Sequence, residues 1–118
     1  MTDQVQAFFS AWTMEDAGLR RATIDAALAA GASYADPRTP EPITDAAALS
    51  DYVGQFIAAA PGAAVEVVKS DSRQGVTRAT IAFRMAGGIE QTGQYFIETD
   101  GSGRITRMIG FVGTGDAG

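Results

Sequence analysis

The chain has 118 residues, of which 46% are hydrophobic and 19% are charged; this is the composition of one folded domain, spanning residues 1–118, and not of a disordered segment. Neither cysteine nor histidine is present, which excludes disulfides, thiolate or histidine metal sites and Ser-His-Asp triads, so we expect no metal and no cofactor. The net charge of -5 and the single lysine, Lys69, argue against a nucleic-acid partner, whose phosphates require basic patches.

The chain begins with the acidic segment Met1-Thr2-Asp3-Gln4, whereas a signal peptide needs positive charge at this place. The longest apolar stretches, such as residues 56–61, are far too short to span a bilayer. We therefore expect a cytoplasmic protein without a membrane partner.

The first half of the chain has helical periodicity. Four apolar residues recur at the i, i+3, i+4 and i+7 positions of one helix face: Val5, Phe8, Phe9 and Trp12. Helices are expected near residues 3–15, 17–29 and 45–59. Thr2 or Asp3 would cap the first helix, and Gly31 would end the second. Between the second and third helices, a short extended segment over residues 32–36 precedes a proline-rich loop.

From Ala64 onward the period of the apolar residues changes from 3.6 to 2, which is typical of strands. Four strands are expected, over residues 64–70, 76–85, 89–99 and 104–112. Turn-forming residues separate them, at Asp71-Ser72, at Gly87-Gly88 and at 100–103. Helices followed by a strand meander predict an α+β fold with an antiparallel sheet, which the segment near Tyr34 would also join.

Both faces of the last two expected strands carry apolar residues. Strict alternation places Phe96, Met108 and Val112 on the outer face of the sheet. A sheet with one face on helices and the other in water should be polar outside. We therefore expect a homodimer through this sheet face, because large apolar patches are rare on monomers.

Three segments of the chain are similar to the nuclear-transport-factor-2-like superfamily, which includes the ketosteroid isomerases and the SnoaL-type polyketide cyclases. They are residues 32–37 (Ala-Ser-Tyr-Ala-Asp-Pro), the helix start near Asp45, and the last strands, from Phe96-Ile97 to Gly110-Phe111. The resemblance covers nearly the whole chain. It implies a cone-like curved antiparallel sheet closed by N-terminal helices around an internal pocket for a small apolar ligand.

The same resemblance implies catalytic candidates. Asp36, directly before Pro37, matches the proton-shuttling aspartate of the ketosteroid isomerases. Trp12 falls near their oxyanion-hole tyrosine and Tyr95 near their second aspartate, and both side chains can donate a hydrogen bond to an enolate. Five more aromatic residues are expected around the ligand: Tyr34, Tyr52, Phe56, Phe83 and Phe111.

Asp36 has two interpretations. An aspartate before proline commonly starts a loop, where its carboxylate binds nearby backbone amides. Alternatively, it is a general base at the pocket mouth. Our first hypothesis is a cofactor-independent isomerase or cyclase acting on an apolar carbonyl compound. The alternatives are a non-catalytic binding domain for a small apolar metabolite and a protein-association module that uses the sheet face.

Overall fold

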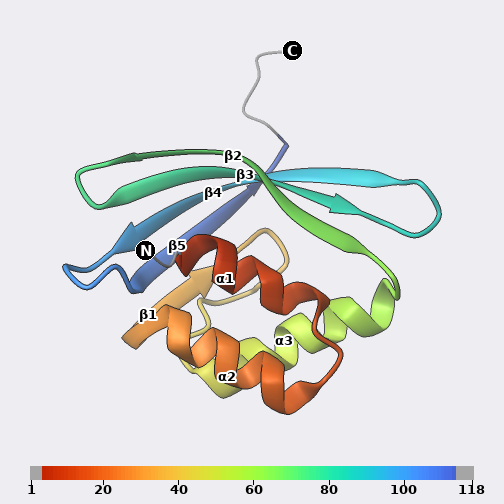
Figure 1. The fold of residues 1–118 in the computed structure, drawn as a ribbon, viewed down its shortest axis with the longest axis horizontal. Helices are drawn as coiled ribbons and strands as arrows, with labels where there is room; N and C mark the ends of the chain where they lie inside the picture. Colours follow the sequence, from red (N-terminus) through yellow and green to blue (C-terminus); the bar gives the residue numbers. More distant parts are fainter. Residues whose placement is uncertain (1–3, 114–118) are drawn as a thin grey trace.

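The computed structural model describes residues 4–113, in which three helices and a 3-10 turn lie on one side of a curved five-stranded sheet (Figure 1). The helical elements are α1 (Gln4–Ser10), η1 (Ala11–Thr13), α2 (Ala17–Ala27) and α3 (Ala46–Ala59). The strands are β1 (Leu28–Ala35), β2 (Ala64–Arg73), β3 (Val76–Arg84), β4 (Glu90–Thr99) and β5 (Ile105–Val112). No helix within residues 4–113 is long and apolar enough to cross a membrane.

The sheet has the strand order β1-β5-β4-β3-β2. The four strands from β2 to β5 form the predicted antiparallel meander, whereas β1 pairs in parallel with β5, with Tyr34 opposite Met108. The predicted α+β fold is confirmed, and the expectation of a wholly antiparallel sheet is corrected to a mixed one. Periodicity assigns the faces of a strand but not its direction, so the parallel pair left no signal in the sequence.

Two of the helices begin at aspartate caps. The Asp16 carboxylate accepts a hydrogen bond from the Leu19 N–H at 3.0 Å, and the Asp45 carboxylate accepts one from the Ala47 N–H at 2.9 Å. The predicted caps at Thr2 or Asp3 lie outside the described residues.

The predicted end of the second helix was wrong by two residues. The helix ends at Ala27, and β1 follows without a loop. Gly31, expected as a helix cap, lies inside β1 with a φ of 74°, where the pairing register with β5 shifts. The left-handed φ that suits a helix cap also suits a strand bulge, so the glycine alone did not distinguish the two.

The turn between β2 and β3 lies further along the chain than the predicted turn at Asp71-Ser72. Asp71 and Ser72 continue β2 and pair with Arg78 and Thr77 of β3, and the turn falls at Gln74-Gly75, where both φ values are positive, 51° and 81°. Two consecutive positive φ values are the geometry of the tight hairpin turn that matches strand twist. The hydroxyls of Ser72 and Thr77 lie 2.7 Å apart and hold the extended ladder together.

The core lies between the helices and the inner face of the sheet. Phe8 and Phe9 of α1 are fully buried, as predicted, and Trp12 continues their stripe through η1. Across from them lie Ile97 and Met108, which are paired on neighbouring strands and fully buried.

Met108 is therefore a core residue, and Val112 follows on the same face, opposite Gly93 and in the lining of the pocket described below, so the predicted place of both residues on the outer face is wrong. A register shift near Glu98, which pairs with Arg107 while Thr99 pairs with Ile105, adds one residue to β5 and reverses the faces beyond it. The apolar residues of β4 and β5 that do face outward are Phe96, Ile109 and Phe111, with the rings of the two phenylalanines 5.7 Å apart.

Candidate functional site

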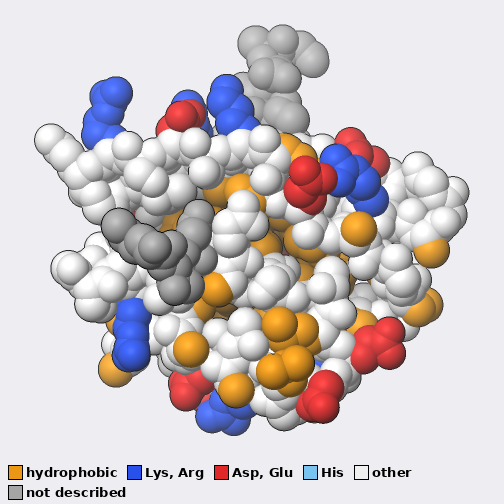
Figure 2. All heavy atoms as spheres, viewed as in Figure 1, with side chains coloured by type: hydrophobic (Ala, Val, Ile, Leu, Met, Phe, Trp, Pro, Cys, Tyr) orange, Lys and Arg blue, Asp and Glu red, His pale blue; other side chains and the backbone are white. Residues whose placement is uncertain are grey.

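A pocket of about 590 Å³ opens between the helices and the sheet, where β3 and β5 end and β4 begins. Hydrophobic side chains are visible in the hollow between the two layers (Figure 2). The loop after β1 supplies the charged residues of the lining, Asp36 and Arg38. A cavity of this size, largely apolar with a few polar groups, is typical of a small-molecule site.

Three aromatic rings from different elements form one wall of the pocket. Trp12 comes from η1, Phe56 from α3 and Phe83 from β3. Their centroids are 5.3 Å apart for Trp12–Phe56, and 5.7 Å apart for Trp12–Phe83 and for Phe56–Phe83. Tilted and edge-to-face contacts at such distances are favourable, so the three rings support one another as a rigid apolar surface.

Asp36 uses its two carboxylate oxygens for different purposes. Its Oδ1 accepts hydrogen bonds from the backbone N–H groups of Arg38 at 2.8 Å and Thr39 at 3.1 Å. Its Oδ2 accepts hydrogen bonds from the hydroxyls of Tyr34 at 2.7 Å and Tyr52 at 2.6 Å. The side chain thus shapes the loop, as one interpretation held, and also borders the pocket, as the other held.

The tyrosines connect Asp36 to a second pocket residue. The hydroxyl oxygens of Tyr34 and Tyr95 lie 2.9 Å apart. A tyrosine hydroxyl carries one proton, and that of Tyr34 is already donated to Asp36, so Tyr95 must donate to Tyr34. The result is a directed chain of hydrogen bonds from Tyr95 through Tyr34 to Asp36.

All three tyrosines of this network stay protonated at neutral pH. Burial raises the pKa of Tyr34 well above 10.0, and the nearby Tyr95 and Asp36 add to the effect. Burial and the hydrogen bond to Asp36 raise the pKa of Tyr52, and burial together with the Asp36 charge raises the pKa of Tyr95. The phenols are therefore hydrogen-bonding groups and not bases.

Trp12 carries a donor that the described part of the chain leaves unused. The side chain is 3% exposed, and its buried indole Nε1–H has no hydrogen-bond partner within residues 4–113. Most buried N–H groups in folded proteins have a partner, and one without a partner is destabilising. Because Trp12 also lines the pocket, its unused donor is a candidate for contact with a ligand.

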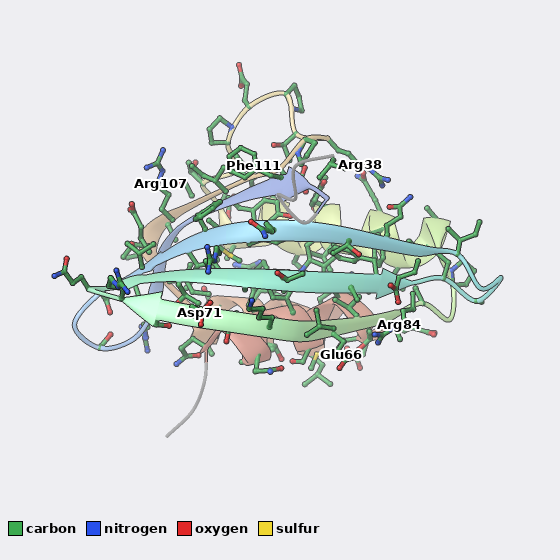
Figure 3. All side chains as sticks on the ribbon, turned by 90° about the horizontal axis from the view of Figure 1, so that it is seen from above. Arg38, Glu66, Asp71, Arg84, Arg107 and Phe111 are labelled. Atoms are coloured by element: carbon green, nitrogen blue, oxygen red, sulfur yellow. The ribbon has the colours of Figure 1, made fainter. Side chains whose placement is uncertain are left out.

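The structure brings most of the predicted site residues to one place. Six of them line the pocket: Trp12, Asp36, Phe56, Phe83, Tyr95 and Phe111. Tyr34 and Tyr52 are not part of the lining and lie behind Asp36, bonded to its carboxylate. Phe111 lies near Arg38 at the end of β5 and is 53% exposed, so it contributes to the rim (Figure 3).

The lining residues that the sequence analysis missed belong to three segments: residues 37–38 of the loop after β1, residues 91–93 at the start of β4, and residues 112–113 at the end of β5. The sequence held one signal that the chain is closely packed beside the pocket, namely the glycines inside β4 and β5, Gly93 and Gly110. A methyl group added at Gly110 would lie 2.6 Å from Cε2 of Tyr95, so the glycine makes room for that ring.

No family model and no curated protein matches the sequence. Solved structures do match. A SnoaL-like family protein from Agrobacterium tumefaciens is 21% identical, with a TM-score of 0.83 over 94% of this chain and 95% of the other. A protein with a ketosteroid-isomerase-like fold from Catenulispora acidiphila, solved with trimethylamine, is 17% identical, with a TM-score of 0.72 over 93% and 85%. A designed protein of the NTF2 fold is 15% identical, with a TM-score of 0.70 over 96% and 88%.

The chain therefore has the nuclear-transport-factor-2-like fold that its sequence resembles. A designed protein shares this fold with natural ones, so the fold alone does not choose an activity. Any function must be argued from the side chains of the pocket.

Proposed function

We propose that this chain, with its nuclear-transport-factor-2-like fold, binds a small, largely apolar carbonyl compound and shifts a proton on it without a cofactor. The proposal rests above all on the carboxylate of Asp36, which borders a pocket whose wall is made of Trp12, Phe56 and Phe83. The chain has no histidine, and the tyrosines of the network hold their protons, so Asp36 is the group best suited to be a base at this place.

In the proposed reaction, Oδ2 of Asp36 takes a proton from a carbon next to the carbonyl group. The electrons of the broken C–H bond move into an enolate, and Asp36 then returns the proton to another carbon, which completes an isomerisation. The indole N–H of Trp12 would donate to the enolate oxygen, where negative charge develops. Tyr34 and Tyr52 would hold the carboxylate in position through their hydrogen bonds.

One observation favours a second candidate function, a binding domain without catalysis. An ionised carboxylate has about four acceptor sites, and Asp36 already accepts four hydrogen bonds within the protein. A base must release at least one of them to receive a proton. If it does not, Asp36 is structural and the pocket only shelters its apolar ligand.

The test uses small cyclic ketones in deuterated water. Exchange of the protons beside the carbonyl is followed by NMR, and binding is followed by the emission of Trp12, the single tryptophan of the chain. We expect both a saturable change in emission and exchange faster than in buffer alone. A change in emission without faster exchange would reject catalysis in favour of the binding domain.

We also propose that two copies of the chain associate through the outer face of the sheet. Phe96, Ile109 and Phe111 face outward there. Ion pairs flank this apolar strip: Arg84 with Glu66 and Glu90, Arg78 with Asp71, and Arg107 with Glu98. Figure 3 shows Arg84 and Glu66 toward one end of the sheet and Asp71 and Arg107 toward the other. A strip flanked by both charge signs can complement a second copy turned about a two-fold axis.

A further inference from the structure

The pocket presents different hydrogen-bonding groups in different charge states of Asp36. Tyr34 and Tyr52 donate to Oδ2 of Asp36, and Tyr95 donates to Tyr34, so every hydroxyl proton of this network is used inside the protein. Tyr95, which lines the pocket, then offers only the lone pairs of its oxygen to a ligand. With Asp36 ionised, this end of the pocket accepts hydrogen bonds.

Protonation of Asp36 at Oδ2 reverses the preferred direction of the chain. The new carboxyl O–H can donate to the Tyr34 oxygen, Tyr34 can donate to Tyr95, and the proton of Tyr95 is free to turn toward the pocket. No heavy atom has to move, because the 2.7 Å and 2.9 Å oxygen–oxygen distances suit a hydrogen bond in either direction. With Asp36 neutral, the same end of the pocket donates.

We propose that Asp36, Tyr34 and Tyr95 form a reversible hydroxyl relay, so that Tyr95 accepts from the ligand while Asp36 is ionised and donates to a ligand oxygen once Asp36 is neutral. This inference rests on the proposed function, because the abstraction of a proton by Asp36 is the event that reverses the chain. The donor at Tyr95 appears only when the negative charge has moved from Asp36 to the enolate oxygen. The relay thereby stabilises the charge that develops in the reaction and not the bound substrate.

Asp36→Asn imitates the neutral state. The amide oxygen of the new side chain can keep the bonds from the Arg38 and Thr39 N–H groups, which places the NH₂ group where Oδ2 was. An NH₂ group donates and cannot accept from Tyr34 or Tyr52, so these hydroxyls must turn away from it. The variant should therefore hold the relay in its reversed direction, with Tyr95 as a donor to the pocket.

The experiment measures which form of 4-nitrophenol the pocket binds, since its neutral and anionic forms differ in absorbance. The wild-type pocket should prefer the neutral phenol, which donates a hydrogen bond to Tyr95. Asp36→Asn should shift the preference toward the anion by about 10- to 100-fold, as expected for a hydrogen bond to a charged group. An unchanged preference in Asp36→Asn would overturn the relay.

Removing the charge of Asp36 would also help an anion directly, and a second background separates the two effects. In Tyr34→Phe the chain is cut, so Asp36→Asn should then shift the preference much less. In Tyr52→Phe, the matched control, one hydroxyl on Oδ2 is lost but the path to Tyr95 is intact, so the full shift should remain. Equal shifts in both backgrounds would refute the relay.

Tyr34 is 1% exposed, so its variant could lose stability, and thermal melting is measured on every protein used. Tyr95→Phe provides a second cut of the relay and should likewise reduce the shift. The readout is the ionic form of a bound phenol and not turnover. A chain that proves inactive toward ketones but shows the Tyr34-dependent shift would contradict the proposed catalysis alone, and an active chain without the shift would contradict the relay alone.

Discussion

Gly110 of β5 lies directly against the ring of Tyr95, which makes Gly110→Ala a sharp perturbation of the site. The added methyl carbon would lie 2.6 Å from Cε2 and 2.9 Å from Cζ of that ring, both far shorter than van der Waals contact. The ring is itself buried and in edge-to-face contact with Phe9 at 5.0 Å. It cannot retreat without disturbing the core or the hydrogen bond to Tyr34.

The expected cost follows from overpacking of a dense core, which is typically about 1–3 kcal/mol. With an unfolding entropy of roughly 2.1 cal/mol/K per residue, a chain of 118 residues should lose roughly 4–12 °C in Tm. The displacement should also move Tyr95 within the pocket, so ligand affinity should fall together with stability.

Thermal denaturation followed by circular dichroism provides the assay. Gly101→Ala is the matched control, because a methyl group at that turn would meet nothing within 4 Å, so we expect a change within about 0.5 kcal/mol. Tyr95→Val removes the ring, and Gly110→Ala should then cost much less. A Tm for Gly110→Ala equal to that of Gly101→Ala would refute the close contact.

Three further predictions concern the unused donor, the tyrosines and the sheet face. Trp12→Phe should weaken the binding of a cyclic ketone about 2- to 10-fold more than that of the matching cycloalkane in calorimetry, and equal losses would show that the indole N–H does not meet the ligand. The pKa values of Tyr34, Tyr52 and Tyr95 are raised in the folded state, so the unfolded chain loses these protons first. Stability from these groups should be fully present below pH 10.0, the ordinary tyrosine pKa, and fall as the pH rises above it; phenolate absorbance in the folded protein at pH 10.0 would contradict this. Phe96→Lys should convert a homodimer into monomers in light scattering, and a monomeric wild-type chain at micromolar concentration would remove the basis for the interface.

Local patterns in the sequence predicted the helices and strands well wherever a pattern is compatible with only one kind of secondary structure. The aromatic stripe of α1 and the change of period at Ala64 gave the helices and the meander. Where a residue suits two structures, the prediction was wrong: Gly31 fits a helix cap or a strand bulge. The faces of β5 were predicted wrongly for another reason, the register shift near Glu98. One inserted residue changes every later side chain from one face to the other, and alternation does not reveal it.

The sequence predicted which residues gather at the candidate site, but it did not predict the hydrogen bonds that join Asp36, Tyr34 and Tyr95. The Asp-Pro pair and the family resemblance indicated Asp36, Trp12 and Tyr95, all of which line the pocket. That Tyr34 bridges Asp36 and Tyr95 depends on the pairing of β1 with β5 and of β5 with β4, which brings residues 61 positions apart within 2.9 Å. Such a contact is a property of the sheet and has no local signal.

The measurement that tests the central claim most directly is the rate of ketone proton exchange for Asp36→Asn, with the ketone dissociation constant determined on the same sample. Asp45→Asn is the matched control, because Asp45 also accepts a hydrogen bond from a backbone N–H but does not line the pocket. We predict that exchange falls by about 10²–10⁴-fold in Asp36→Asn, the usual contribution of a general base, while the ketone binds at least as tightly as in the wild type, because Tyr95 can then donate to its carbonyl oxygen. Exchange at the rate of Asp45→Asn, together with a lower melting temperature, would show that Asp36 only holds its loop and would contradict its role as the base.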